Sequence, residues 1–402
     1  MATEVNSLPS SAAQLIMARE TSIGVLPGSP QYFAVDVNEY GDFGSNQELL
    51  SRRVISQRRR RLRGDIVSEE VNAGFTLDFT PTMITHLMPS IMLTDPFEQP
   101  SKGTVFDTGL SVAGTPVDYD IGADAAAAGW RAGHLLYAEN FTNPANNGLK
   151  EVTGIDGNTI EASGLVAEAS PPDEAVIRAV GIQFGAGELD VVKSGGQYPV
   201  LSIVSGSLSW SNFRIEPGSR IFIGGTAAAN RFVADANNGW ARVLSVSPTA
   251  LTLDRVDGGA DDDTDMSTEV GGGLSIQVFL SDKVSDVQLN DALYNRISQF
   301  IERRLGEPNP VGSPGVIQTE DLLGTVSSTA VISVQNQSKS TVEVELIGIE
   351  SNEHTGEVGD ERTTDGATIL AVPESGFLNN SSHVVRSLLS RYTGDGERID
   401  RL

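Results

Sequence analysis

The sequence predicts a mainly β protein built from more than one domain, and three features support this prediction. First, 42 glycines and 18 prolines separate many short apolar stretches, which is typical of strands joined by turns. Second, residues 71–80 and 341–346 alternate apolar and polar side chains, the pattern of a strand that buries one face. Third, the chain has 402 residues, whereas one domain usually has roughly 100–200. Two or three domains are therefore expected.

The two alternating strands place carboxylates on their polar faces. The odd positions of residues 71–80 are apolar, so Asp78 is expected to face solvent. In residues 341–346 the even positions are apolar, and Glu343 and Glu345 are expected to be exposed.

Helical signals are few. An apolar stripe runs from Met83 to Ile91, with Thr80 as an N-cap and Pro81 in the first helical position. Pro89 is expected to kink or end this helix. A second helix is predicted over residues 381–391, and residues 289–301 fit either a helix or a strand.

The middle of the chain contains an internal repeat. Residues 131–160 resemble residues 216–251, and the apolar positions keep the same spacing after an Asn-Asn-Gly turn in each copy. Asn-Gly between apolar stretches is a strong hairpin signal. We predict two small antiparallel β-barrels (Ig- or SH3-like) at residues 103–184 and 185–282; the alternative is a chance likeness of two hairpins. The flanks, 1–102 and 283–402, are each short of core residues and are expected to form one interrupted domain.

The charge balance is strongly acidic, with a formal net charge of −25. Such a chain repels DNA. The negative charge either serves only to keep the protein dispersed, or it lets DNA slide past without binding. The absence of cysteine excludes disulfides and thiolate chemistry. No secretory signal and no long apolar run is visible, so we expect folding in a cytoplasm and no membrane insertion.

Motifs for catalysis, cofactors or metals are not found, and we predict a non-enzyme without a cofactor. The histidines, His86, His134, His354 and His383, are far apart in sequence. The acidic run Asp261–Asp265 matches the first ligand positions of an EF-hand loop, but Met266 and Gly272 replace the required glycine and glutamate. A solvated hairpin tip is preferred there over a cation site.

A dense arginine cluster precedes the first alternating strand. It consists of Arg52, Arg53, Arg58, Arg59, Arg60, Arg61 and Arg63. Three interpretations are open: docking onto an acidic neighbouring copy, a solvated loop, or contact with nucleic acid. Docking is preferred, because arginine pairs in a bidentate way with carboxylates and the rest of the protein is anionic.

The flanks resemble the major tail tube protein of long, non-contractile-tailed phages. That family often begins with an Ala-x-Glu stretch followed by an aromatic residue, Gly-x-x and Pro; here the stretch is Ala18–Pro30, with Ile23 in the aromatic position. A long polar loop (48–63), a β-strand (71–80), a short helix and the long strand that ends near Gly348 follow in the family's order. The resemblance covers residues 1–102 and 283–402.

This resemblance implies a β-sandwich that forms part of a barrel, with a short flanking helix. Subunits of the family form hexameric rings that stack into a tube around a lumen. Asp78, Glu343 and Glu345 would line that lumen, and the arginine cluster would contact the next ring. The implied partners are further copies, the tail tip or initiator complex, the tape measure and tail terminator proteins, and DNA in transit. The implied location is the virion tail, after assembly in the host cytoplasm.

Two other classes of protein stay open. One is a virion decoration or baseplate protein. The other is a carbohydrate-binding adhesive protein that uses the two barrels as binding modules. The tryptophans, Trp130, Trp210 and Trp240, all lie in the barrel region. A sugar site needs one of them exposed, whereas core packing is the commoner fate of tryptophan.

Overall fold

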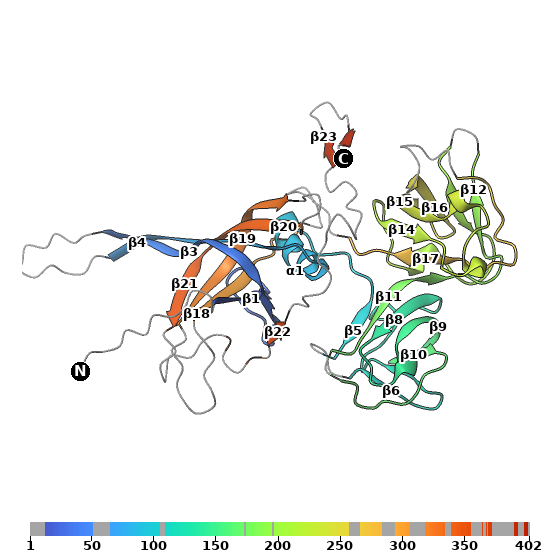
Figure 1. Cartoon of the computed structure of the whole chain (residues 1–402), viewed down its shortest axis with the longest axis horizontal. Helices are drawn as coiled ribbons and strands as arrows, with labels where there is room; N and C mark the ends of the chain where they lie inside the picture. The colour runs from blue at the N-terminus through green and yellow to red at the C-terminus, as the bar shows by residue number, and fades with distance from the viewer. Residues whose placement is uncertain are drawn as a thin grey trace, which may run out of the picture. The chain divides into compact units, whose positions relative to one another are not determined.

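A computed structural model describes most of the chain, which forms two compact units (Figure 1). The described residues are 13–50, 65–104, 109–172, 174–194, 197–256, 266–283, 294–305, 318–333, 339–354, 364, 367, 369–371, 390–392 and 398–400. Unit 1 combines Met1–Pro96 with Val284–Leu402, and unit 2 is Phe97–Lys283. The ends of the chain thus contribute to one unit and its middle forms the other.

Unit 1 is built on one bent sheet with a single helix among its described residues. Its elements are β1 (Ala13–Arg19), β2 (Tyr32–Val35), β3 (Val37–Leu50), β4 (Asp65–Asp78), α1 (Pro81–Met92), β18 (Gln299–Leu305), β19 (Gln318–Ser333), β20 (Thr341–Gly348), β21 (Glu350–His354), β22 (Ile369–Ala371), β23 (Ser390–Tyr392) and β24 (Arg398–Asp400). The strand order is β22-β2-β1-β18-β19-β20-β4-β3, and β21 also pairs with β19. These pairs are antiparallel except β2–β22. β23 and β24 pair with each other.

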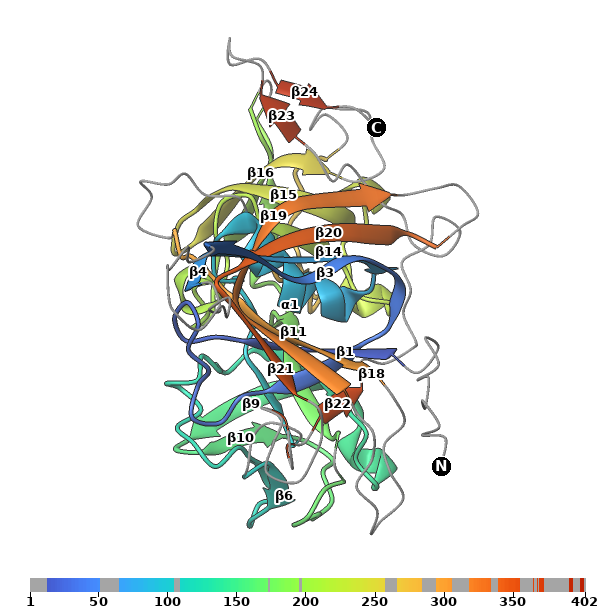
Figure 2. The same cartoon turned by 90° about the vertical axis from the view of Figure 1, so that its left-hand side faces the viewer.

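The bend lets strands from distant parts of the sheet share one core. Leu15 and Phe33 from β1 and β2 pack in the same hydrophobic cluster as Phe75 and Val344 from β4 and β20. Figure 2 shows these strands passing on either side of α1. Unit 1 therefore has a sandwich-like arrangement of mainly antiparallel strands.

The helix α1 begins at Pro81, which confirms the predicted start. It continues to Met92, so Pro89 does not end the helix at its own position, and the helix stops three residues after it. Leu87 and Met88 are buried in the core just before the proline, which holds the last turn in place. Ser90 also donates a hydrogen bond from its hydroxyl to the Leu87 carbonyl at 2.8 Å.

The two remaining helix expectations have different outcomes. Residues 390 and 391, at the end of the predicted helix 381–391, lie in β23, so the prediction is wrong there; residues 381–389 lie outside the described residues. The ambiguous stretch 289–301 ends in a strand, because Gln299–Ile301 belong to β18.

Unit 2 contains two successive halves with the same strand order. The first half has β5 (Ser101–Gly103), β6 (Ser111–Ala113), β7 (Asp118–Asp120), β8 (His134–Glu139), η2 (Pro144–Asn146), β9 (Gly148–Asp156), β10 (Thr159–Ala162) and β11 (Val176–Gln183). The second half has β12 (Leu189–Val192), β13 (Val200–Ile203), η3 (Trp210–Asn212), β14 (Arg220–Ile223), η4 (Ala228–Asn230), η5 (Asp235–Asn237), β15 (Gly239–Val246), β16 (Ala250–Val256) and β17 (Gln277–Leu280). The orders are β6-β7-β10-β9-β8-β11 and β12-β13-β16-β15-β14-β17. We call residues 101–179 the first repeat and residues 181–280 the second repeat.

The Asn-Asn-Gly turns of the two repeats have matching hydrogen bonds. Asn147 exchanges hydrogen bonds of 2.9 and 2.8 Å with the backbone of Phe141. Asn238 makes the same pair, both 2.9 Å, with Phe232. Because the side-chain amide replaces a backbone partner, it fixes the chain that enters the hairpin.

A glutamate closes each turn from the far side. Glu168 accepts hydrogen bonds from the backbone of Thr142 and Asn143 and from the Asn146 amide, at 2.8, 3.1 and 2.9 Å. Glu269 accepts from the backbone of Val233 and Ala234 and from the Asn237 amide, at 2.6, 3.1 and 2.8 Å. The likeness of residues 131–160 and 216–251 thus extends to individual hydrogen bonds.

The strand β11 belongs to both repeats. Its first half, Val176–Arg178, pairs with β5 and β8 and completes the first repeat. Its second half, Gly181–Gln183, pairs with β17 of the second repeat. Gly181–Gln183 therefore has the place in the second repeat that Ser101–Gly103 has in the first.

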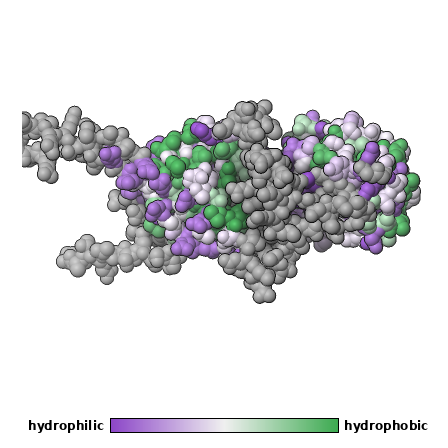
Figure 3. Space-filling model, turned by 90° about the horizontal axis from the view of Figure 1, so that it is seen from above, coloured by the Kyte–Doolittle hydropathy of each residue, from purple (hydrophilic) through white to green (hydrophobic). Residues whose placement is uncertain are grey.

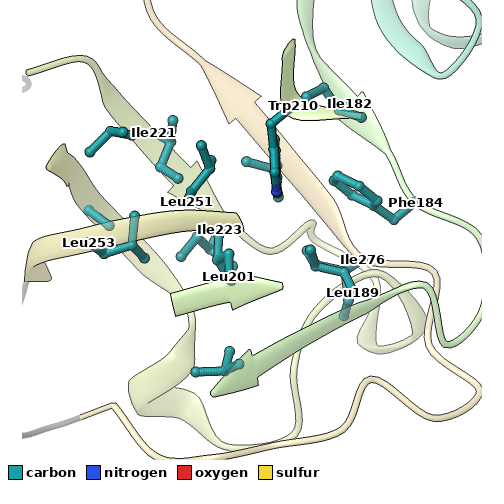
Figure 4. Packing of buried hydrophobic residues seen from close by; sticks show 14 of the residues in the cluster. Ile182, Phe184, Leu189, Leu201, Trp210, Ile221, Ile223, Leu251, Leu253 and Ile276 are labelled. Atoms are coloured by element: carbon teal, nitrogen blue, oxygen red, sulfur yellow. The ribbon is translucent and has the colours of Figure 1, made fainter. Parts of the chain in front are cut away.

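Each repeat has its own hydrophobic core. Trp130 lies in the core of the first repeat and Trp210 in that of the second, both fully buried. Figure 4 shows Trp210 among Ile182, Phe184 and Leu251. Ile182 comes from β11, so the shared strand also contributes side chains to the second core.

Candidate functional site

The three carboxylates predicted to line a lumen lie on neighbouring strands. β4 and β20 pair with Thr341 opposite Asp78, Glu343 opposite Thr76 and Glu345 opposite Gly74. Along β20 the alternate residues Val342, Val344 and Leu346 are buried, which leaves Glu343 and Glu345 on the solvent side. We call this side of β3, β4, β19 and β20 the acidic face.

The carboxylates of the acidic face differ in their surroundings. Asp78 accepts hydrogen bonds at 2.9 Å from the Lys339 ammonium and from the Asn38 amide, and its side chain is 17% exposed. Lys339 therefore offsets the charge of Asp78. Glu343 and Glu345, by contrast, are exposed.

A fourth carboxylate, Glu39, joins the acidic face from β3. It pairs with Thr76 across the β3–β4 ladder and is exposed. Register shifts interrupt this ladder between Val37 and Glu39 and between Tyr40 and Phe43. These bulges hide the alternation of β3 in the sequence, so sequence reasoning missed Glu39.

Apolar side chains lie between the carboxylates. Val331 stands opposite Glu343 on β19 and is 48% exposed, and Ile347 follows Glu345 on the same side of β20 and is 53% exposed. Figure 3, with unit 1 on the left, shows hydrophobic and hydrophilic side chains next to each other on the face seen from above.

A buried glutamate holds the loop of the Ala-x-Glu stretch against the sheet. The Glu20 carboxylate accepts hydrogen bonds from the Gly24 and Gly324 backbone at 2.8 and 2.9 Å and from the Ser298 hydroxyl at 2.6 Å. Glu20 is 5% exposed, so protein donors rather than water make nearly all hydrogen bonds to its carboxylate oxygens. Next to it, the aliphatic side chains of Ile23 and Ile349 remain exposed.

A second buried polar cluster anchors the C-terminal segment. Glu302 is fully buried, pairs with Arg304, and accepts hydrogen bonds at 2.7 Å on both oxygens from the Thr364 hydroxyl. Asp321, also buried, lies 3.3 Å from His354. Burial raises the pKa of Tyr32, and the carboxylates of Glu302 and Asp321 raise it further. The cluster ties Thr364 to β18, which indicates a structural role.

The histidines are dispersed. His86 stacks on Phe33 with ring centroids 4.4 Å apart, and burial lowers its pKa. His134 is fully buried, and burial together with the charge of Arg131 lowers its pKa to about 4. Among the described residues, no group of three or more His, Asp or Glu side chains is arranged to hold a metal ion.

The arginine cluster Arg52–Arg63, the acidic run Asp261–Asp265 and His383 lie outside the described residues. In the described part of the chain, no helix has the length and apolar character that crossing a membrane requires.

No protein-family model matches the chain, and no curated protein is similar to it.

Proposed function

We propose that the chain is the structural subunit of a phage tail tube, in which hexameric rings stack and DNA passes through an acidic lumen. The observation that carries the proposal is the acidic face, where Glu39, Glu343 and Glu345 lie exposed on β3 and β20, the two antiparallel neighbours of β4. The resemblance of residues 1–102 and 283–402 to the tail tube family supports it.

The acidic face suits a surface along which DNA moves. Duplex DNA carries about one negative charge per 1.7 Å, and basic side chains hold it at the phosphates. Carboxylates repel the phosphates over a Debye length of about 8 Å at physiological salt. DNA then slides past Glu343 and Glu345 without stopping.

The ends of the sheet suit ring formation. β3 is the last strand in the described order, so one of its edges has no partner strand there. In the proposed ring a neighbouring copy adds a strand at this edge, which removes an exposed edge and closes a barrel.

The β3–β4 hairpin suits stacking. Each of its strands has 14 residues, and the connection between them carries the arginine cluster Arg52–Arg63. In the proposed tube these guanidinium groups pair with carboxylates of the next ring.

Electron microscopy tests the proposal. We expect the purified, concentrated chain to form hollow rings or tubes with six-fold end views, alone or after addition of tail-tip complexes. Reversal of the charges of Arg58–Arg61 to glutamate should leave rings and abolish tubes. Neutralising Glu343 and Glu345 to glutamine should leave tubes intact but make them retain DNA, whereas Glu151→Gln in unit 2 should not. A chain that stays monomeric or trimeric with tail-tip complexes contradicts the proposal.

A further inference from the structure

The second repeat carries three aromatic side chains side by side on the outer face of its sheet. Phe222 on β14 pairs directly with Trp240 on β15 and, on its other side, with Phe279 on β17. The ring centroids are 5.4 Å apart for Phe222 and Trp240 and 6.4 Å apart for Phe222 and Phe279. We call these three residues the aromatic row.

The aromatic row is accessible from solvent. Trp240 is 42% exposed, and Phe222 and Phe279 are half-buried. Their strand neighbours Ile221 and Val278 point the other way and are fully buried in the core. The row therefore lies outside the core, unlike the fully buried Trp130 and Trp210.

The first repeat shows that the fold does not require these rings. By the same strand pairing, the positions of Phe222, Trp240 and Phe279 correspond to Tyr137, Leu149 and Arg178. There Arg178 forms an ion pair with Glu139 at 3.5 Å. Since both repeats have the same strand order and turn hydrogen bonds, the aromatic row is a property of the second repeat alone.

The borders of the aromatic row are polar or small. Arg220 and Arg242 lie opposite each other at the next positions of β14 and β15 on the same face. Gly181 of β11 lies opposite Phe279 and presents no side chain there. The result is a short aromatic surface with guanidinium groups along one side.

The small area of the aromatic row and the negative net charge of the chain restrict the class of ligand that can bind there. A stable protein interface covers about 800 Å² per partner and about 20–30 residues on each side, far more than three half-exposed rings. Nucleic acid also stacks on aromatic rings, but a net charge of −25 opposes it. A pyranose ring has one apolar C–H face, which packs on an aromatic ring, and hydroxyl groups at its rim, which accept hydrogen bonds from arginine.

We propose that the aromatic row is a saccharide-binding site, in which sugar rings pack on Trp240, Phe222 and Phe279 and the adjacent Arg220 and Arg242 donate hydrogen bonds to their oxygens. The site lies within unit 2 and goes beyond the tail tube proposal, which concerns unit 1. The saccharide test gives its result whether or not the chain forms rings.

Tryptophan fluorescence of the full chain measures binding at this site. Of the three tryptophans in the chain, Trp130 and Trp210 are fully buried, so iodide quenches mainly Trp240. The soluble probes are an N-acetylglucosamine tetramer, maltoheptaose and a hexuronate tetramer. A printed array of bacterial surface polysaccharides measures binding of the chain in parallel. We expect at least one saccharide to bind, and a soluble saccharide that binds should shield Trp240 from iodide.

Variants at matched positions locate the site. Phe222→Ala should weaken binding about tenfold, the effect of losing one aromatic contact. Phe222→Leu, which keeps the bulk of the side chain, should also weaken binding and replaces the alanine variant if that one does not fold. Tyr137→Ala, at the corresponding position of the first repeat, should have no effect. The proposal is overturned if no probe binds, if Tyr137→Ala weakens binding as much as Phe222→Ala, or if oligo(dT) binds in place of saccharides.

Discussion

Replacing Glu168 with alanine should specifically destabilise the first repeat. The carboxylate accepts three hydrogen bonds, from two backbone amides and the Asn146 side chain. At about 0.5–1.5 kcal/mol for each net hydrogen bond, the free energy of unfolding should fall by about 2–4 kcal/mol. The side chain is half-buried, so little apolar contact is lost and the hydrogen bonds dominate the change.

The pH dependence of Glu168 gives a second readout. Burial raises the pKa of its carboxyl, but hydrogen bonds from Thr142, Asn143 and Asn146 outweigh this and bring it below the usual 4.5. A carboxyl with a lowered folded-state pKa stabilises the fold above its unfolded pKa, and this stabilisation is lost as the pH falls through the folded pKa. The wild-type first repeat should therefore lose this stabilisation below about pH 4.5, and the alanine variant should not.

Urea unfolding followed by fluorescence separates the two repeats in variants that keep only Trp130 or only Trp210. Trp130 reports the core of the first repeat and Trp210 that of the second. Glu168→Ala should shift the Trp130 transition to lower urea. Glu151→Ala, which removes an exposed glutamate on β9, is the control and should leave it in place. Equal unfolding of wild type and Glu168→Ala would refute the reasoning that the carboxylate holds the turn.

Two further predictions concern buried groups. Burial lowers the pKa of His134 to about 4, so protonation of this side chain favours the unfolded chain. Acidification from pH 6.5 to pH 4 should therefore lower the free energy of unfolding by about 3 kcal/mol. Thermal unfolding of His134→Phe should lack this loss, and a variant with the same pH profile as the wild type would argue against a neutral His134. Glu20→Gln places an amide donor against the backbone N–H of Gly24 or Gly324. This should lower the free energy of unfolding by about 1–3 kcal/mol and speed proteolysis at residues 20–30. Equal proteolysis rates for the variant and the wild type would contradict the anchoring role.

The elements predictable from sequence are those with local signals. β4 and β20 bury every second residue, so their alternation is visible in the chain. The start of α1 at Pro81 follows from the preference of proline for the first turn. The Asn-Asn-Gly turns were recognisable because their hydrogen bonds join residues close in sequence.

The features missed from sequence depend on tertiary contacts. β3 is polar and interrupted by bulges, and the pattern predicted a loop over its last residues, Glu48–Leu50. The aromatic row assembles from three strands, so no local sequence pattern indicates that Phe222, Trp240 and Phe279 stand side by side. The buried Glu302 lies in a strand whose neighbours give no sign of its partner Thr364, 62 residues away.

The shared strand β11 limits how the two repeats can be separated. A cut after residue 183 would deprive the second repeat of the strand segment that pairs with β17, and would leave that edge open to aggregation. During synthesis, Gly181–Gln183 leave the ribosome about 95 residues before their partners Gln277–Phe279. A first repeat that is already folded would present Gly181–Gln183 as an edge on which β17 completes the sheet of the second repeat. A gain or loss of the second repeat in evolution must accordingly include Gly181–Gln183, the segment that pairs with β17.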